Sequence, residues 1–207
     1  PVSLDQVRYE GIEQITSDDI DYARELGLGL KLVGTAERVD GGLSVRVHPV
    51  FLYGQHPLAS VHGPFNAVTV ESPEITEITL SGPGAGGPQT ATAVLGDVVS
   101  AMIPPASVPE TSQVLPIVED VTSAFYVRLE VADRPGVLAQ VAEIFGLQGI
   151  SIRSLVQHGL GDDARLVMTI HPALESRVAA ALGLLSRQDF LRSAPKAIRV
   201  IDEQFGQ

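Results

Sequence analysis

The sequence has no cysteine and no tryptophan, and its only lysines are Lys31 and Lys196. Without cysteine there can be no disulfide, no thiolate metal site and no cysteine nucleophile. Lys and Arg together number 14 against 25 Asp and Glu, a formal net charge of −11. Because nucleic acids and anionic membranes bind clusters of basic residues, this balance argues against both as partners.

Long apolar runs are also missing. No stretch of apolar residues is long enough to span a bilayer, and the first residues lack the pattern of a signal peptide. We therefore expect a soluble, cytoplasmic protein. The chain has 207 residues, of which 44% are hydrophobic, so it can bury one large core or two small ones.

The first half of the chain predicts one helix, several strands and a glycine-rich loop. Thr16 followed by Asp18 and Asp19 is typical of a helix N-terminus, where acids meet the positive end of the helix dipole, and Gly27 suits its end. The expected elements are a helix over 16–27, a hairpin of 31–38 and 43–50 around a turn at 40–42, strands at 68–72 and 74–80, a glycine-rich loop at 81–88, and a helix over 89–102.

The last third predicts the order βαββαβ. The expected strands cover 125–131, 150–156, 165–170 and 197–201, the helices 137–147 and 174–185, and the turns 133–136 and 159–163. This order is typical of the ferredoxin-like unit, in which two helices cover one face of a four-stranded antiparallel sheet. The fold class is therefore α+β. We expect the other face of this sheet, without a helix, to be buried by self-association.

The turn of this last unit carries a specific pattern. Residues 132–138 (ADRPGVL), with Ile144-Phe145 and 149–152 (GISI), resemble the ACT family. That resemblance implies pairing of copies side by side and binding of an amino acid between the turn and the second strand of a neighbour. The effector-binding candidates are Asp133, Arg134, Pro135, Gly136 and Val137, with Ile150 and Ser151 across the interface. A plain strand-to-helix turn is the alternative reading.

The residues before it resemble another family. The order and spacing of 10–12 with 29–32, of 47–50 with 57–59 and 66–68, and of 82–86 with 90–97 are similar to the substrate domain of homoserine dehydrogenases. The resemblance implies that a glycine loop closes over the nicotinamide end of NAD(P); its residues are Gly82, Pro83, Gly84, Ala85 and Gly86. Loop glycines before a helix can hold backbone close to a ring or a phosphate. A mobile turn between strand and helix is the simpler alternative.

No catalytic and no metal-binding residue is assigned. A dinucleotide-binding βαβ unit is not visible, and Lys31 stands in an alternating strand where a solvated lysine is ordinary. The five histidines lack the spacing of a metal site. The resemblance places the family's catalytic lysine before Pro1, which would fall in mid-domain. We therefore expect a piece of a longer protein that cannot transfer hydride by itself.

These patterns divide the chain into a partial substrate domain (1–103), a proline-containing linker (104–120) and an ACT domain (121–207). The leading hypothesis is the C-terminal part of an NAD(P)-dependent homoserine dehydrogenase. This part would form a homo-oligomer, a dimer or tetramer, and would sense an amino acid, threonine being the first candidate. The rival from another class is a non-catalytic amino-acid-binding or oligomerisation module, and a second enzymatic rival is a phosphoglycerate-type dehydrogenase with an ACT domain.

Overall fold

The computed structural model describes residues 2–39, 41–104, 114–159 and 164–201. The predictions for Asp40, for most of the linker, for the turn after Gly159 and for the last six residues lie outside this part of the chain. The chain forms two compact units. Unit 1 comprises residues 1–54 and 115–202, and unit 2 comprises 55–114.

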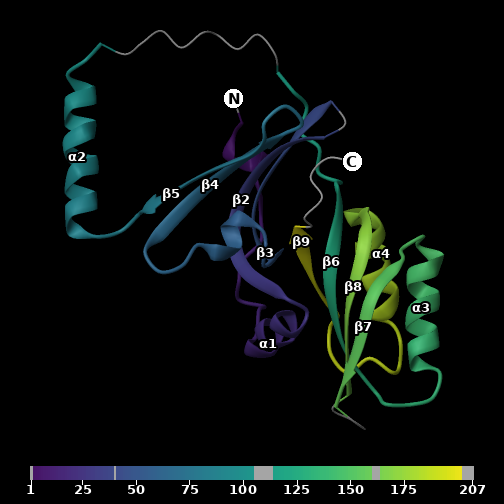
Figure 1. Ribbon diagram of the computed structural model, residues 1–207. Helices are drawn as coiled ribbons and strands as arrows, with labels where there is room; N and C mark the ends of the chain where they lie inside the picture. The colour runs from purple at the N-terminus through teal and green to yellow at the C-terminus, as the bar shows by residue number, and fades with distance from the viewer. Residues whose placement is uncertain (1, 40, 105–113, 160–163, 202–207) are drawn as a thin grey trace. The chain divides into compact units, whose positions relative to one another are not determined.

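Unit 1 contains most of the regular structure (Figure 1). Its elements in chain order are the 3-10 helix η1 (Leu4–Gln6), β1 (Arg8–Tyr9), α1 (Ser17–Glu25), β2 (Leu28–Val39), β3 (Gly42–Tyr53), β6 (Thr122–Val131), α3 (Val137–Leu147), β7 (Ile152–His158), β8 (Ala164–Leu174), α4 (Glu175–Leu185) and β9 (Lys196–Ile201). The predicted α+β fold class and the βαββαβ order are confirmed.

The strands of unit 1 form one seven-stranded sheet. Strands β9, β6, β8 and β7 lie next to one another in that order and are antiparallel, which is the ferredoxin-like arrangement. Strand β3 then continues the sheet, because Val50–Leu52 pairs in parallel with Arg199–Ile201 of β9. On its other side β3 pairs with β2 along the predicted hairpin. Segments about 150 residues apart in sequence thus share one sheet.

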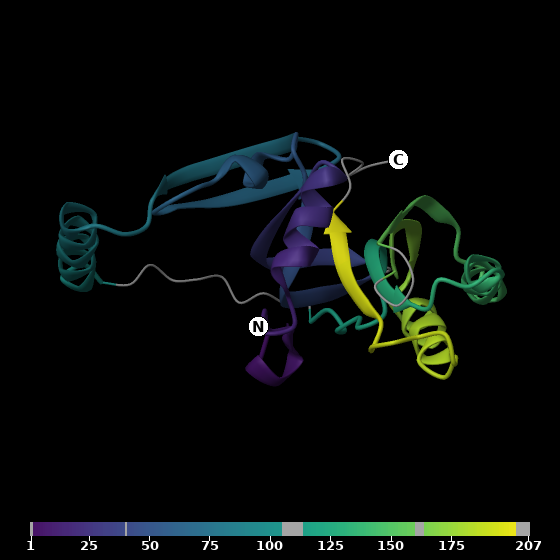
Figure 2. The same cartoon turned by 90° about the horizontal axis from the view of Figure 1, so that it is seen from below.

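Apolar side chains pack on both faces of this sheet. On one face α3 and α4 cover β6 and β8, with Val141, Phe145 and Leu185 fully buried. On the other face α1 lies against the sheet (Figure 2). Ala23 of this helix packs with Phe51 and Tyr126. The prediction that no helix covers this second face is therefore wrong, because the N-terminal segment supplies one.

Helix α1 begins and ends where the sequence indicates. The Thr16 side chain accepts a hydrogen bond from the Asp19 backbone N–H, while Asp19 Oδ2 accepts one from the Thr16 N–H at 2.9 Å. This reciprocal capping box satisfies two backbone donors that a helix N-terminus leaves unpaired. Gly27 follows the helix with φ +74°, a conformation that glycine adopts without strain.

The same aspartate also holds α1 to the sheet. Its other carboxylate oxygen, Oδ1, lies 2.7 Å from Nε of Arg128 on β6, and Asp19 and Arg128 are 0% and 5% exposed. Lys196 of β9 adds a second positive charge, 3.6 Å from Asp19 Oδ2. Loss of either member of a buried ion pair leaves the other charge buried without compensation, which is strongly destabilising. Asp19 therefore caps a helix and anchors it.

A second buried cluster joins β3 to α4. The Arg46 guanidinium, 2% exposed, pairs with Glu175 at 2.8 Å, and Arg199 and Arg8 reach the same carboxylate at 3.3 and 3.1 Å. His48 lies among these cations. Burial first, and then the positive charges of Arg199, Arg46 and Arg8, lower the pKa of His48 to about 4. His48 is thus neutral at pH 7.

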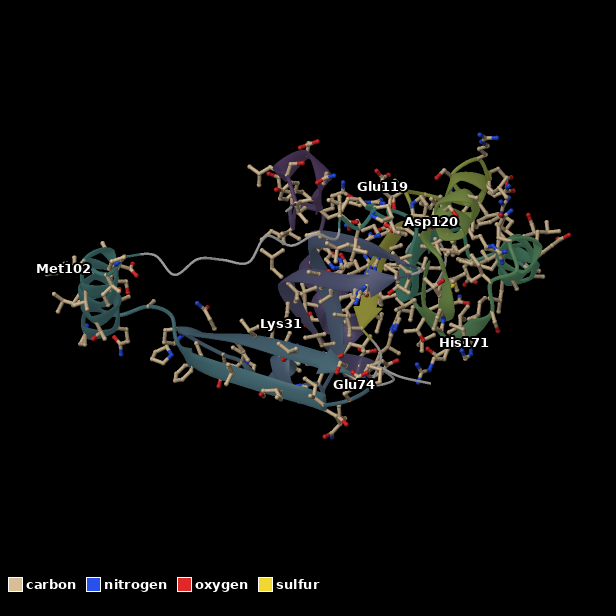
Figure 3. All side chains as sticks on the ribbon, turned by 90° about the horizontal axis from the view of Figure 1, so that it is seen from above. Lys31, Glu74, Met102, Glu119, Asp120 and His171 are labelled. Carbon is tan, nitrogen blue, oxygen red and sulfur yellow. The ribbon has the colours of Figure 1, made fainter. Side chains whose placement is uncertain are left out.

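The described end of the predicted linker, from Leu115 on, belongs to unit 1. Leu43 donates a backbone hydrogen bond to Pro116 at 2.8 Å and accepts one from Val118 at 3.0 Å. Next along the chain, Glu119 and Asp120 lie beside α4 (Figure 3), and the Asp120 carboxylate accepts hydrogen bonds from the Ser176 backbone and hydroxyl at 2.9 and 2.6 Å. These residues position the start of α4.

Unit 2 is a hairpin followed by a helix. Its elements are the 3-10 helix η2 (Pro57–Ser60), β4 (Phe65–Ser72), β5 (Thr76–Pro83) and α2 (Gly87–Ala101). No residue of α2 is buried, and Met102 projects from its end (Figure 3). Val68 and Leu80, paired across the hairpin, are also exposed. A two-stranded sheet with this much exposed apolar surface is only marginally stable alone.

Among the described helices of the chain, none is both long enough and apolar enough to cross a membrane.

The ion pair of α1 gives the first prediction. Asp19→Asn leaves Arg128 buried and only partly compensated, so we expect the free energy of unfolding to fall by about 3 kcal/mol. The matched control is Asp21→Asn on the same helix, where the carboxylate pairs with Arg24 at the surface; it should cost less than about 1 kcal/mol. Urea unfolding followed by circular dichroism compares the two, and equal losses would contradict the anchoring role of Asp19.

Candidate functional site

A cleft opens at the turn between β6 and α3. Its volume is about 340 Å³, which lies within the range of small-molecule sites. It is lined by Val131, Ala132, Asp133, Arg134, Pro135, Gly136, Val137, Leu138, Gln157 and Leu166. The structure thus brings five of the seven predicted effector-binding residues, 133–137, into one concave surface.

Gly136 shapes this cleft through its backbone. It is the N-cap of α3 and has φ +91° and ψ −13°, the left-handed region that residues with a Cβ avoid. The turn therefore changes direction within one residue, and the first turn of α3 starts directly at the cleft wall. A helix N-terminus carries a partial positive charge and backbone N–H groups, which favour a carboxylate.

The polar side chains of the cleft come from the turn and from β7. Gln157 Nε2 donates a hydrogen bond to Asp133 Oδ1 at 3.2 Å. Arg134 Nη2 lies 3.2 Å from Asp189, an exposed pair that solvent screens. The remaining wall is apolar, with Val131, Pro135 and Leu138 among its members. A carboxylate, an amide and an apolar wall beside a helix N-terminus can bind a small amphoteric molecule.

The other two predicted effector residues lie elsewhere. Ile150 and Ser151 follow α3, whose 11 residues separate them from the turn by roughly 16 Å. Ile150 is buried, and the Ser151 carbonyl accepts a hydrogen bond from the His171 backbone at 2.9 Å. They do not line the cleft of their own chain. Their predicted role toward a neighbouring copy stays a prediction.

Sequence reasoning missed Gln157. Residues of a strand alternate between faces, and Leu155 packs under α3 and α4. Counting two onward from Leu155 would have placed Gln157 on the side of the cleft. A register shift between Ile152 and Ser154 obscures this count from the start of the strand, because Ile152 packs on the same face as Leu155.

The predicted glycine loop lies in unit 2, where it is shorter than expected: Gly82 and Pro83 are the last residues of β5, and only Gly84, Ala85 and Gly86 lie between β5 and α2. Gly84 donates a backbone hydrogen bond to Pro64 at 2.7 Å, and a Cβ on Gly84 would overlap the side chain of Asn66. Gly86, with φ +131°, is the N-cap of α2. A Cβ on Gly82 would meet nothing within 4 Å. The predicted order of strand, loop and helix is confirmed, and the loop is exposed on its unit rather than packed in an apolar interior.

Other groups of titratable residues are engaged in structural contacts. A larger cleft of about 550 Å³ includes Arg8 and Lys196, but Arg8 pairs with Glu175, and Lys196 donates to the Gln14 carbonyl. In unit 2, His56 lies 3.8 Å from Glu71, and burial lowers the pKa of His56. No group of three metal-ligating side chains occurs within the described residues.

A comparison of Gly136, the N-cap of α3, with Gly146 inside the helix distinguishes the backbone role of Gly136 from a steric role. A Cβ at Gly136 or at Gly146 would meet nothing within 4 Å, but only Gly136 has a positive φ. We expect Gly136→Ala to lower the free energy of unfolding by about 1 kcal/mol and Gly146→Ala to raise it by roughly 0.5 kcal/mol through helix propensity. Denaturant titration of both variants measures this; the same sign for both would contradict the assignment.

Two known protein families match the sequence of this chain. The homoserine dehydrogenase family matches residues 1–99, and the ACT domain family matches residues 125–189. The second match contains every residue that lines the cleft. The first match contains α1, the hairpin of β2 and β3, and the glycine loop.

Individual relatives agree with this assignment. The homoserine dehydrogenase of Corynebacterium glutamicum is 38% identical over 96% of this chain and 47% of its own length, and that of Synechocystis sp. is 37% identical over 97% and 50%. The crystal structure of a homoserine dehydrogenase from Thiobacillus denitrificans matches with a TM-score of 0.87 at 33% identity, covering 98% of this chain and 49% of that one. The chain spans about half the length of these relatives. It therefore belongs to the homoserine dehydrogenase family, corresponding to its C-terminal portion, and carries an ACT domain.

Proposed function

We propose that this chain is the substrate-domain and regulatory part of an NAD(P)-dependent homoserine dehydrogenase, which interconverts homoserine and aspartate semialdehyde. The observation that carries the proposal is the similarity to named homoserine dehydrogenases over nearly the whole chain. Within the protein, the ACT cleft would bind an amino-acid effector. Threonine, an end product of the route through homoserine, is the first candidate.

The chemistry of the cleft supports an amino acid as ligand. The α-carboxylate would face the N-terminus of α3 and the α-ammonium group would pair with Asp133, while the apolar wall would take a small side chain. Homo-oligomers, dimers or tetramers, would bring Ile150 and Ser151 of a second copy to this site.

The glycine loop supports a role beside the nicotinamide. NAD(P), when bound, supplies or accepts the hydride; the contribution of this chain would be a wall formed largely by the backbone of Gly82, Gly84 and Gly86. Asn66 occupies the space that a Cβ at Gly84 would need, so the loop follows the hairpin closely while Gly82 faces open space. These residues fit contact with a flat ring. They offer no partner for the adenine or the ribose, which the rest of the protein would bind.

The dehydrogenase assignment is tested by activity. The natural protein that contains this sequence should reduce NAD(P)⁺ when given homoserine, followed by the absorbance of the reduced nicotinamide. The 207-residue chain alone should show no turnover above background. Turnover by the chain alone would refute the proposal that the hydride-transfer residues lie outside it. No turnover by the natural protein would favour the non-catalytic, amino-acid-binding module.

The effector assignment is tested by calorimetry with threonine. We expect Asp133→Asn to weaken threonine binding about tenfold or more, because the ammonium group loses its charged acceptor. Glu143→Gln is the matched control: it removes an exposed carboxylate from α3, away from the lining of the cleft, and should leave the affinity unchanged. An unchanged affinity in Asp133→Asn would place the ligand elsewhere.

A further inference from the structure

We infer that β7 couples the ACT cleft to α1, with Gln157 and His158 as the two positioning residues that make the connection. Gln157 contacts the cleft and His158 contacts α1. Because α1 belongs to the part of the chain that matches homoserine dehydrogenase, the coupling would carry the state of the sensor into the enzyme. The inference deepens the proposed function and rests on amino-acid binding in the cleft.

Alternation along the strand places these neighbours on opposite faces of the sheet. On the side of α3, Gln157 donates to Asp133 at 3.2 Å. On the side of α1, the His158 ring stacks on Tyr22 with a centroid distance of 4.4 Å, and its Nε2 lies 3.5 Å from Glu25 Oε2. One short stretch of strand therefore contacts both the sensor and the helix.

Strand β8 strengthens the hold on α1. Arg165 is the cross-strand partner of His158. Its guanidinium donates to the Tyr22 hydroxyl at 2.8 Å and lies 3.2 Å from Asp18. The end of the β7–β8 pair thus contacts three side chains of α1: Asp18, Tyr22 and Glu25. These contacts are partly exposed, so they can be exchanged at lower cost than the buried pair of Asp19 and Arg128.

Ligand binding would change the first of these contacts. The ammonium group of an amino acid would compete with the Gln157 amide for the Asp133 carboxylate, because a charged donor forms a stronger hydrogen bond with a carboxylate than a neutral amide does. β7 has β8 as its one neighbour in the described sheet, so its far side offers no strand to resist a shift. Release of Gln157 loosens the end of β7, and the stacking of His158 on Tyr22 weakens. By linkage, loosening α1 must favour ligand binding by the same factor.

The test is amide hydrogen–deuterium exchange in α1, residues 17–25, with and without saturating threonine. In the 207-residue chain we expect threonine to accelerate exchange of α1 about fivefold, the lower end of measured couplings. His158→Ala should abolish this response and raise the affinity for threonine by a similar factor. Arg24→Ala, an exposed change on the same helix, should keep the response. Gln157→Leu, without ligand, should accelerate α1 as threonine does.

The outcomes separate this inference from the proposed effector. Threonine binding with unchanged exchange in α1 would overturn the coupling and leave the sensor assignment intact. If threonine fails to bind but Gln157→Leu still accelerates α1, the coupling stands and the choice of effector falls. If Gln157→Leu leaves α1 unchanged, or if His158→Ala retains the full response to threonine, β7 does not connect the two sites.

Discussion

The buried ion pair between Asp19 and Arg128 is the constraint on which unit 1 depends. It fixes a helix of the dehydrogenase-like segment to the second face of the ACT sheet, in a region where neither charge can be left alone. The parallel pairing of β3 with β9 adds backbone hydrogen bonds to the same junction. Family boundaries and packing boundaries therefore differ: residues 1–54 resemble one family but share a core with the other. The divisions expected at residues 103 and 121 describe the sequence and stay predictions for the fold.

This shared core changes what the ACT domain is in this chain. A sensor joined only by a linker would report through its own assembly. Here α1, from outside the ACT match, lies against the sheet, and β3 continues the sheet by pairing with β9. Tyr126 of β6, whose pKa is raised by burial, packs with Ala23 and Phe51 of that outside segment. A change in the ACT sheet thus meets the segment that matches homoserine dehydrogenase within one side chain. Coupling between the sites needs no long chain of intermediates.

Local signals in the sequence predicted the elements well. Thr16, Gly27, Gly136 and Gly149 mark helix ends through capping and positive φ, properties of one residue and its neighbours. Helix α3 spans Val137–Leu147, the range that the sequence predicted. The cleft was predictable for the same reason, since five of its residues form one turn whose pattern is specific to a family.

Contacts between distant segments were not predictable from these signals. Asp19 was interpreted only as an acid at a helix N-terminus, although its second oxygen binds Arg128. Arg128 alternates with apolar residues, which indicates a face but not its partner. The pairing of β3 with β9 depends on register across most of the chain, and neither strand carries a mark of the other. Gln157 was hidden by the register shift that precedes it.

The position of the cleft beside an edge strand has a thermodynamic consequence. Any second copy that extends this sheet along β7 also borders the turn at 133–137. Binding of a ligand in the cleft and association of two copies would therefore be thermodynamically linked. Mass action then makes the midpoint of a titration depend on how much protein is in the cuvette. Dilution of the protein would therefore change the apparent affinity of the cleft for its ligand.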